Sequence, residues 1–273
     1  MADDGLPDMN AIVGQQDIVL LTLDTLRFDA AQHCFEHGEL PVLSAYFSPS
    51  GWERRHTPGS FTYAAHAAFF AGFLPTPARP GPHPRLFALD FEGSETTLSN
   101  TYVCREGSSI VEGLRHAGYR TICIGGTGFF NKKNPLGSQL PGLFEESYWE
   151  PSFGVTAPDS TDHQIALACA RLRASELRNT RCFLFINISA VHQPNRHYLT
   201  DASEDDYRSH CAAMRYVDTA LAPLFGALRE RGKAFVIVCS DHGTAYGEDG
   251  YHGHRLAHDV VMTVPYAHFT LTP

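Results

Sequence analysis

The chain has 273 residues, and its 21 basic and 30 acidic side chains give a formal net charge of −9 at pH 7. Apolar residues make up 43% and charged residues 19% of the sequence, which is ordinary for a globular protein and excludes a disordered chain. The acidic balance argues against nucleic-acid binding, which needs a basic face. A small anionic substrate stays compatible with it, because a bound metal ion inverts the local field.

Targeting signals and cysteine usage are typical of a cytoplasmic protein with no membrane partner. No apolar run approaches the ~18 residues that a membrane helix needs. Residues 1–14 carry acids and no basic residue, unlike a secretory signal. The seven cysteines are widely spaced and include no Cys-x-x-Cys pair, so buried reduced thiols are the simplest interpretation.

Strand-like apolar runs alternate with helical patterns along the chain. The predicted strands lie at 17–23, 119–124, 182–188 and 234–239, and the predicted helices at 62–72, 109–117, 160–177 and 205–231. This alternation predicts an α/β fold with a mostly parallel central sheet and helices on both faces. The Pro- and Gly-rich stretches at 73–84 and 125–142 are expected to be loops rather than domain linkers, so we expect one domain over 1–273.

In such sheets, ligands bind at the carboxyl ends of the strands, and two candidate residues lie near predicted element ends. Asp24 directly follows the strand at 17–23, where it could bind a hard cation, act in catalysis, or cap the next helix. Thr62 opens a short Ala-rich helix. Its hydroxyl could be an N-cap, or a nucleophile attacking an anion held by the helix dipole, if a base or metal activates it.

A third segment follows the strand at 234–239. Asp241 and His242 come where the chain turns before Gly243, so both could bind one ion. Four of the 15 histidines fall between residues 242 and 258. The alternative is a solvated loop with incidental histidines.

In this order, the segments resemble the sulfatase-like branch of the alkaline phosphatase superfamily. The motifs are Ser-Asp-His-Gly at 240–243, Gly-His-Arg at 253–255, Leu-Asp-Thr-Leu-Arg at 23–27 and the helix-to-strand step at 113–121. The resemblance runs from Asp17 to about Phe269. It implies a small form that lacks the C-terminal subdomain of larger sulfatases.

The resemblance implies a role for each motif residue. Asp24, Asp241 and His242 match divalent-metal ligands, and Thr62 matches the covalent nucleophile, which also touches the metal. Zinc and manganese suit these ligands about equally.

Two further histidines are implied to work on the substrate. His192, in Val-His-Gln-Pro at 191–194, is expected to contact the substrate or protonate the leaving group. His254 is expected to face the substrate oxyanion or a second metal.

Departures from the family pattern favour phosphorus esters. Sulfatases make formylglycine from Cys/Ser-x-Pro-x-Arg, whereas this chain has Thr-Tyr-Ala-Ala-His at 62–66, and Thr25 stands where they have a second acid. The resemblance therefore implies a metal-dependent hydrolase of phosphate, phosphodiester or phosphonate esters that works through phosphothreonine. Alternatives are a sulfate-ester hydrolase without formylglycine, a phosphomutase-type transferase, or a non-catalytic binding protein. The expected partner is a small anionic ester. The resemblance extends to small proteins that accompany peptide-modifying enzymes, so the ester could be derived from a peptide or another natural product.

One pair of residues resembles a second zinc site. Asp159 and His163 have the Asp-x-x-x-His spacing of nucleotide pyrophosphatases, but in this chain they precede a predicted helix. We expect Asp159 or Ser160 to be an N-cap and Asp162 to lie in the first turn, with second-metal ligation left as the alternative. Other histidines, namely His33, His116 and His210, are expected at the surface.

Overall fold

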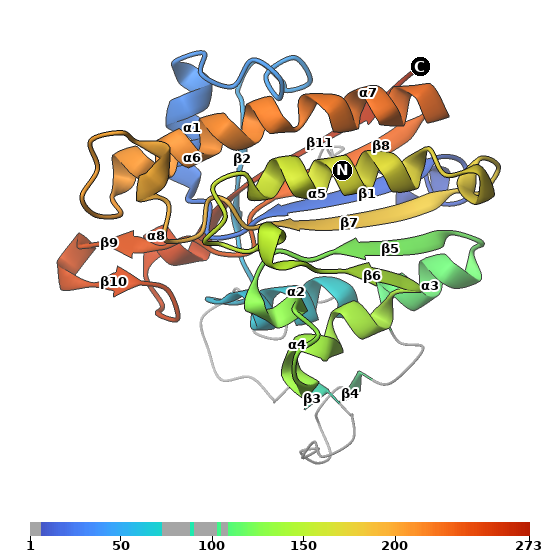
Figure 1. The fold of residues 1–273 in the computed structure, drawn as a ribbon, viewed down its shortest axis with the longest axis horizontal. Helices are drawn as coiled ribbons and strands as arrows, with labels where there is room; N and C mark the ends of the chain where they lie inside the picture. Colours follow the sequence, from blue (N-terminus) through green and yellow to red (C-terminus); the bar gives the residue numbers. More distant parts are fainter. Residues whose placement is uncertain (1–6, 73–87, 90–102, 105–108) are drawn as a thin grey trace, which may run out of the picture.

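The computed structural model describes residues 7–72, 88–89, 103–104 and 109–273 (Figure 1). At its centre is a seven-stranded sheet with the order β2-β11-β8-β1-β7-β5-β6. The strands are β1 (Asp17–Leu23), β2 (Glu53–His56), β5 (Arg120–Ile124), β6 (Glu146–Tyr148), β7 (Cys182–Ile188), β8 (Ala234–Cys239) and β11 (Thr263–Leu271). β1, β5, β6, β7 and β8 are parallel, whereas β11 is antiparallel to β8 and to β2. Two small pairs are β3 (Ala88–Leu89) with β4 (Val103–Cys104), and β9 (Ala245–Tyr246) with β10 (His252–Gly253).

Helices cover both faces of this sheet, which confirms the predicted fold class (Figure 1). One face carries α1 (Phe28–Glu36), α5 (Ser160–Leu172), α6 (Tyr207–Ala220) and α7 (Ala222–Arg231). The other carries α2 (Thr62–Ala71), α3 (Ile110–His116) and α4 (Pro135–Gln139). A last short helix, α8 (Asp259–Met262), lies next to the β9–β10 pair.

The strand β1 shows how the two cores are made. All seven of its residues are buried, as expected for a parallel strand covered on both sides. Val19, Leu21 and Leu23 join the core under α5, α6 and α7, whereas Ile18 and Leu20 join the core under α2 and α3. This alternation follows from the two-residue period of a strand.

Three predicted segments differ from the structure. The predicted helix at 160–177 ends at Leu172, and a separate 3-10 turn follows at Ser175–Leu177. The predicted helix at 205–231 is two helices, because Pro223 in the first turn of α7 has no N–H to continue the ladder. The expected loop at 125–142 contains α4, which Asn134 caps and Pro135 opens. The expected loop at 73–84 lies outside the described residues.

Six cysteines are buried and free, namely Cys34, Cys123, Cys169, Cys182, Cys211 and Cys239. Of the helices in the described ranges, none has the length and apolar character to cross a membrane.

Candidate metal and nucleophile site

The candidate site lies where three neighbouring parallel strands end. β8, β1 and β7 are adjacent, so their carboxyl ends share one edge of the sheet. Asp24 follows β1, and Asp241 and His242 follow β8. One ligand atom from each of these three buried residues lies within 4.8 Å of the other two. The structure thus brings together the three predicted metal ligands.

Each of the two carboxylates uses one oxygen for hydrogen bonds and leaves the other without a partner. Asp24 Oδ2 accepts from Asn187 Nδ2 at 3.0 Å, and Asp241 Oδ1 accepts from the backbone N–H groups of Thr25 at 3.1 Å and His242 at 3.0 Å. Within the described residues, neither Asp24 Oδ1 nor Asp241 Oδ2 has a hydrogen-bond partner, although both are buried. Buried, unpaired carboxylate oxygens are costly, and a cation is the partner that fits them.

The pKa values of the two carboxylates also indicate a site for a cation. Burial, helped by the Asp241 charge, raises the pKa of Asp24 to about 6. Burial raises the pKa of Asp241 to about 7. Each group is therefore held in a place that disfavours its charge until a cation is present.

His242 has the tautomer that metal binding requires. Its Nδ1–H donates to the Gly243 carbonyl at 2.9 Å. The lone pair of Nε2 is then free, and this atom lies 3.5 Å from Asp241 Oδ2 and 3.9 Å from Asp24 Oδ1. Burial lowers the pKa of His242, which favours the neutral ring that ligates metals.

The turn after β1 uses Thr25 in an unusual way. Its φ of 64° places a β-branched residue in the left-handed region, which is rare and strained. In this conformation, its backbone N–H donates to Asp241. Thr25, which stands where the resemblance implies a second acid, therefore supports the predicted ligand Asp241 through its backbone.

Thr62 faces this cluster rather than capping its helix. Phe61 occupies the N-cap position of α2, and Thr62 is the first helical residue. The Thr62 hydroxyl donates to Asp24 Oδ2 at 3.3 Å and lies 3.4 Å from His242 Nε2. The N-cap alternative is therefore wrong for Thr62. It is also wrong for Asp24, because Arg27 holds the N-cap position of α1.

Sequence reasoning missed His66, which lies one turn after Thr62. Burial lowers its pKa to about 3, so its ring is neutral. Its Nδ1–H donates to the Thr62 carbonyl at 2.7 Å, and its Nε2 accepts from the Thr22 hydroxyl at 2.9 Å. His66 therefore ties the first turn of α2 to β1. The only signal in the sequence is its i,i+4 spacing from Thr62.

Asn187 was missed as well. It lies within β7, in an otherwise apolar run, and is fully buried. Its side-chain amide donates to Asp24, and its Oδ1 accepts from the backbone N–H of Thr127 at 3.0 Å. The signal that could have found it is a polar side chain one residue before the end of a buried strand.

The two remaining predicted residues, His192 and His254, lie beside this cluster. Their rings are 5.5 Å apart, and the His254 ring is 4.7 Å from that of His242. Burial lowers the pKa of His254 to about 3. The Nδ1–H of His192 donates to the Gln193 carbonyl at 2.5 Å, which leaves its Nε2 free. With Thr62, both histidines line a cavity of about 390 Å³.

The β9–β10 hairpin that leads to His254 is held by a buried guanidinium. Arg27 donates to Glu248 Oε1 at 2.5 Å and to the Thr244 carbonyl at 3.4 Å. Glu248 accepts in turn from the backbone N–H of Tyr246 at 2.6 Å. Arg27 thus anchors the hairpin to the turn after β1.

Of the three histidines expected at the surface, His33 and His116 are exposed, but His210 is buried. His210 Nε2 accepts from the backbone N–H of Arg27 at 3.3 Å, and its Nδ1–H donates to Tyr246 Oη at 2.9 Å. It is buried because α6 packs on α1, with this side chain in between.

The Asp159–His163 pair lies on the surface. The two side chains are 60% and 48% exposed and bond to each other at 3.0 Å. Asp162 lies in the first turn, as expected, and Asp159 occupies the N-cap position of α5, although its side chain bonds to His163 and makes no capping hydrogen bond. In the described part of the chain, Asp24, Asp241 and His242 form the one group of three potential ligands.

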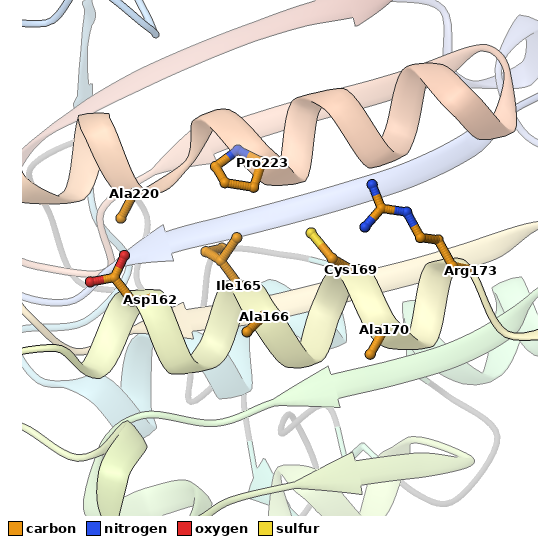
Figure 2. A pocket seen from close by; sticks show the side chains of 8 residues that line it. All are labelled: Asp162, Ile165, Ala166, Cys169, Ala170, Arg173, Ala220 and Pro223. Carbon is orange, nitrogen blue, oxygen red and sulfur yellow. The ribbon is translucent and has the colours of Figure 1, made fainter.

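A second hollow, of about 360 Å³, lies between α5 and α7 (Figure 2). Its lining is mainly small and apolar, with Asp162 near one end and Arg173 near the other. None of the predicted site residues line it. It therefore plays no part in the site described above.

Solved structures with this fold include enzymes of several kinds. The periplasmic domain of EptC from Escherichia coli, in a complex with Zn, has a TM-score of 0.63 at 12% identity, over 93% of this chain and 72% of that one. The lipoteichoic acid synthase LtaP from Listeria monocytogenes has a TM-score of 0.62 at 15% identity, over 96% and 66%. The PsFucS1 sulfatase from Pseudoalteromonas sp. has a TM-score of 0.56 at 15% identity, over 96% and 63%.

The sequence itself matches one family. A search of curated proteins finds no match. The family model described as Sulfatase matches residues 16–266, which is nearly the whole chain. The protein therefore belongs to the sulfatase family.

Proposed function

We propose that this protein is a metal-dependent enzyme that cleaves phosphate, phosphodiester or phosphonate esters through a covalent intermediate on Thr62. The observation that carries the proposal is the Thr62 hydroxyl, 3.3 Å from Asp24 and 3.4 Å from His242, beside two unpartnered carboxylate oxygens. Structural neighbours named as a phosphoethanolamine transferase and a lipoteichoic acid synthase support phosphorus chemistry on this fold. A threonine in place of Cys or Ser argues against formylglycine chemistry.

The metal ligands would be Asp24 Oδ1, Asp241 Oδ2 and His242 Nε2, with the Thr62 hydroxyl as a fourth. This donor set suits zinc or manganese, and zinc is present in a neighbour's structure. A bound divalent ion would lower the pKa of the Thr62 hydroxyl and offset charge on the phosphoryl oxygens.

In the first half of the reaction, Thr62 Oγ1 attacks phosphorus as the bond to the departing alcohol oxygen breaks. Asp24 Oδ2 already accepts the hydroxyl hydrogen and is placed to take this proton. The amino end of α2 favours the anionic group in front of it. Proton delivery to the alcohol is assigned to His192, because the Gln193 carbonyl fixes Nδ1–H and leaves Nε2 to exchange a proton. The neutral His254 ring is suited to donating a hydrogen bond to a phosphoryl oxygen.

In the second half, water attacks the phosphothreonine and passes a proton to His192 Nε2, while Thr62 Oγ1 leaves and takes back its proton from Asp24. The sum is one ester and one water converted to one alcohol and one phosphorus acid. If an alcohol replaces water, the same intermediate gives transfer instead, as the names of the neighbours suggest. Heavy-oxygen water distinguishes the two, because only hydrolysis places the label in the released acid.

The test is metal analysis of the purified protein, followed by a screen of nitrophenyl phosphate, phosphodiester, phosphonate and sulfate esters. We expect turnover of phosphorus esters, and a phosphoryl mass increment on the peptide that contains Thr62 after rapid acid quench. A protein that turns over sulfate esters alone, or whose increment lies on another peptide, would overturn the proposal.

A further inference from the structure

We propose that the cavity in front of Thr62 binds the alcohol part of the ester and selects an uncharged alcohol with an aromatic or extended apolar group. This inference rests on the proposed function and names its substrate class. Four features of the cavity carry it: its position, its aromatic wall, its exposed leucine and its lack of charge.

The position follows from the geometry of in-line displacement. The attacking and departing oxygens lie on opposite sides of phosphorus. Thr62 lines the cavity, whereas Asp24, Asp241 and His242 do not. The cavity is therefore the space that remains for a group leaving away from the metal ligands, and His192 lies there to protonate it.

An aromatic cluster lies beside Thr62, and one of its rings, that of Phe129, lines the cavity. The Phe129 ring lies 6.3 Å from the Phe61 ring and 5.7 Å from the Tyr63 ring, so the two neighbours of Thr62 in the chain both pack near Phe129. All three rings are partly exposed. Partly exposed rings at this spacing offer faces and edges on which another aromatic or apolar group can pack.

Leu136 extends this apolar surface. It lies on α4, lines the cavity and is 49% exposed, one of four large apolar side chains exposed in the described ranges. A single exposed leucine needs no explanation, but a leucine that lines the same cavity as Phe129 indicates an apolar binding surface.

The described lining carries no Asp, Glu, Lys or Arg side chain. Lys132 and Lys133 lie on the same segment but point elsewhere, because Lys132 donates to the Ser147 carbonyl at 3.1 Å and Lys133 lies 4.6 Å from the centre of the Trp149 ring. A cationic alcohol would lose hydration in this cavity without gaining a partner of opposite charge, and an anionic one would meet only the proton donor His192, which gives up its charge as the alcohol departs.

Two of the polar side chains in the lining, Asn131 and Asn134, are amides whose oxygens are already used. Asn131 Oδ1 accepts from the backbone N–H of Lys133 at 2.9 Å, and Asn134 Oδ1 accepts from that of Gly137 at 2.8 Å. Their NH₂ groups are left to donate. The cavity therefore suits hydroxyl, ether or carbonyl oxygens on an otherwise apolar alcohol.

The experiment compares three aryl phosphonates that carry a neutral acetamido, an anionic carboxylate or a cationic trimethylammonium group at the same ring position. Binding to the metal-loaded Thr62→Ala protein is measured by calorimetry, and turnover of the matching phosphate esters is measured with the wild type. We expect the neutral compound to bind, and its ester to react, at least about tenfold better than either charged one.

Two wall variants sharpen the test. Phe129→Ala and Leu136→Ser should each weaken binding of the neutral aryl compound by about tenfold and leave that of methylphosphonate unchanged. Met9→Ser, which changes another exposed apolar side chain outside the cavity lining, should alter neither. Leu136→Lys should shift the preference towards the carboxylate compound.

The outcomes separate the two proposals. Equal binding of all three compounds, no binding of any, or a preference for trimethylammonium on the aromatic wall would each overturn the inference. The proposed function would still stand if phosphorus esters were turned over through Thr62. Absence of all such turnover, with selective binding of the neutral compound, would overturn the function and leave the cavity's selectivity established.

Discussion

The metal corner and the cavity wall both lie near Thr62, and they are made from different kinds of structure. The metal corner comprises Asp24, Asp241 and His242, at the ends of two central strands with almost every residue buried. The cavity wall comprises Phe129, Leu136 and the two asparagines of the segment around α4, and it is partly exposed. The corner is thus held by the core, whereas the wall is held by local caps and turns.

Because the two regions differ in this way, substitutions in the corner should affect the chemical step, whereas substitutions in the wall should affect the choice of substrate. A change in the corner alters groups that would act on every ester, so its effects should not depend on the alcohol. A change in the wall alters contacts with one part of the substrate, so its effects should appear as a ratio between substrates. Substitutions in each region, and between them, can test this separation.

The largest effect is expected at the hydroxyl shared by both regions. Thr62→Ala removes the nucleophile, so kcat should fall by about 10⁴-fold for every reactive ester, whatever its alcohol. Steady-state kinetics on a charged and a neutral ester would check this. Thr62→Ser keeps the hydroxyl and serves as the control. Unchanged turnover in Thr62→Ala would contradict a nucleophilic role for this residue.

Removal of one corner charge should act on metal binding first. Asp241→Asn replaces a carboxylate oxygen that has no hydrogen-bond partner among the described residues, so metal affinity should fall by at least about 100-fold. Metal content after dialysis, measured by elemental analysis, gives the answer. Asp218→Asn is a matched control, because Asp218 is also a buried acid but accepts from the backbone of Val42 and Leu43. Equal metal content in both variants would remove Asp241 from the ligand set.

The corner should also make the metal-free protein sensitive to pH. Burial raises the pKa of Asp24 to about 6 and of Asp241 to about 7, so these two carboxyl groups bind more protons in the folded state than in the unfolded state between about pH 4 and pH 7. Their contribution to the free energy of unfolding of the metal-free protein should therefore fall as pH rises through this window, whereas the buried histidines, whose pKa values burial lowers, act in the opposite direction. Added metal should raise Tm more at pH 8 than at pH 5, because protons compete with it at low pH.

Thermal melts with and without zinc would check this at both pH values. Relative to the metal-free wild type, the Tm of metal-free Asp241→Asn should be higher at pH 8 than at pH 5, because the variant lacks one of the two carboxyl groups that are costly when charged. A difference in Tm between the two proteins that does not change between pH 5 and pH 8 would contradict this contribution of Asp241.

The same contrast explains which parts of the fold could be predicted. β1, β7 and β8 were predicted at their observed bounds, because strands buried on both faces are continuous apolar runs. β2 has the sequence Glu-Arg-Arg-His and is exposed throughout, so no apolar pattern marks it. It forms because β11 offers a partner edge, and such a contact between distant segments is invisible in a local pattern.

Some residues of the candidate site could likewise be predicted from the sequence, and others could not. Asp24, Asp241 and His242 were found because strand ends and a family motif mark them, and parallel pairing brings strand ends together. His66 was missed because its ring bonds to the Thr22 hydroxyl on β1, and Asn187 because its amide bonds to the Asp24 carboxylate, and both of these partners come from other segments. The break at Leu221 was missed because Pro223 is compatible with the first turn of a new helix and only interrupts a continuous one.

The smallest effect is expected at His66, whose ring positions Thr62 through the backbone of α2. His66→Phe removes the donor to the Thr62 carbonyl and the acceptor for Thr22, so α2 loses two ties near the nucleophile. We expect kcat to fall by about tenfold, with KM and metal content close to the wild type for both charged and neutral esters. His66→Gln, which keeps a donor and an acceptor, should recover part of the rate. Loss of metal, or a loss of rate that depends on the alcohol, would show that His66 belongs to the corner or to the wall instead.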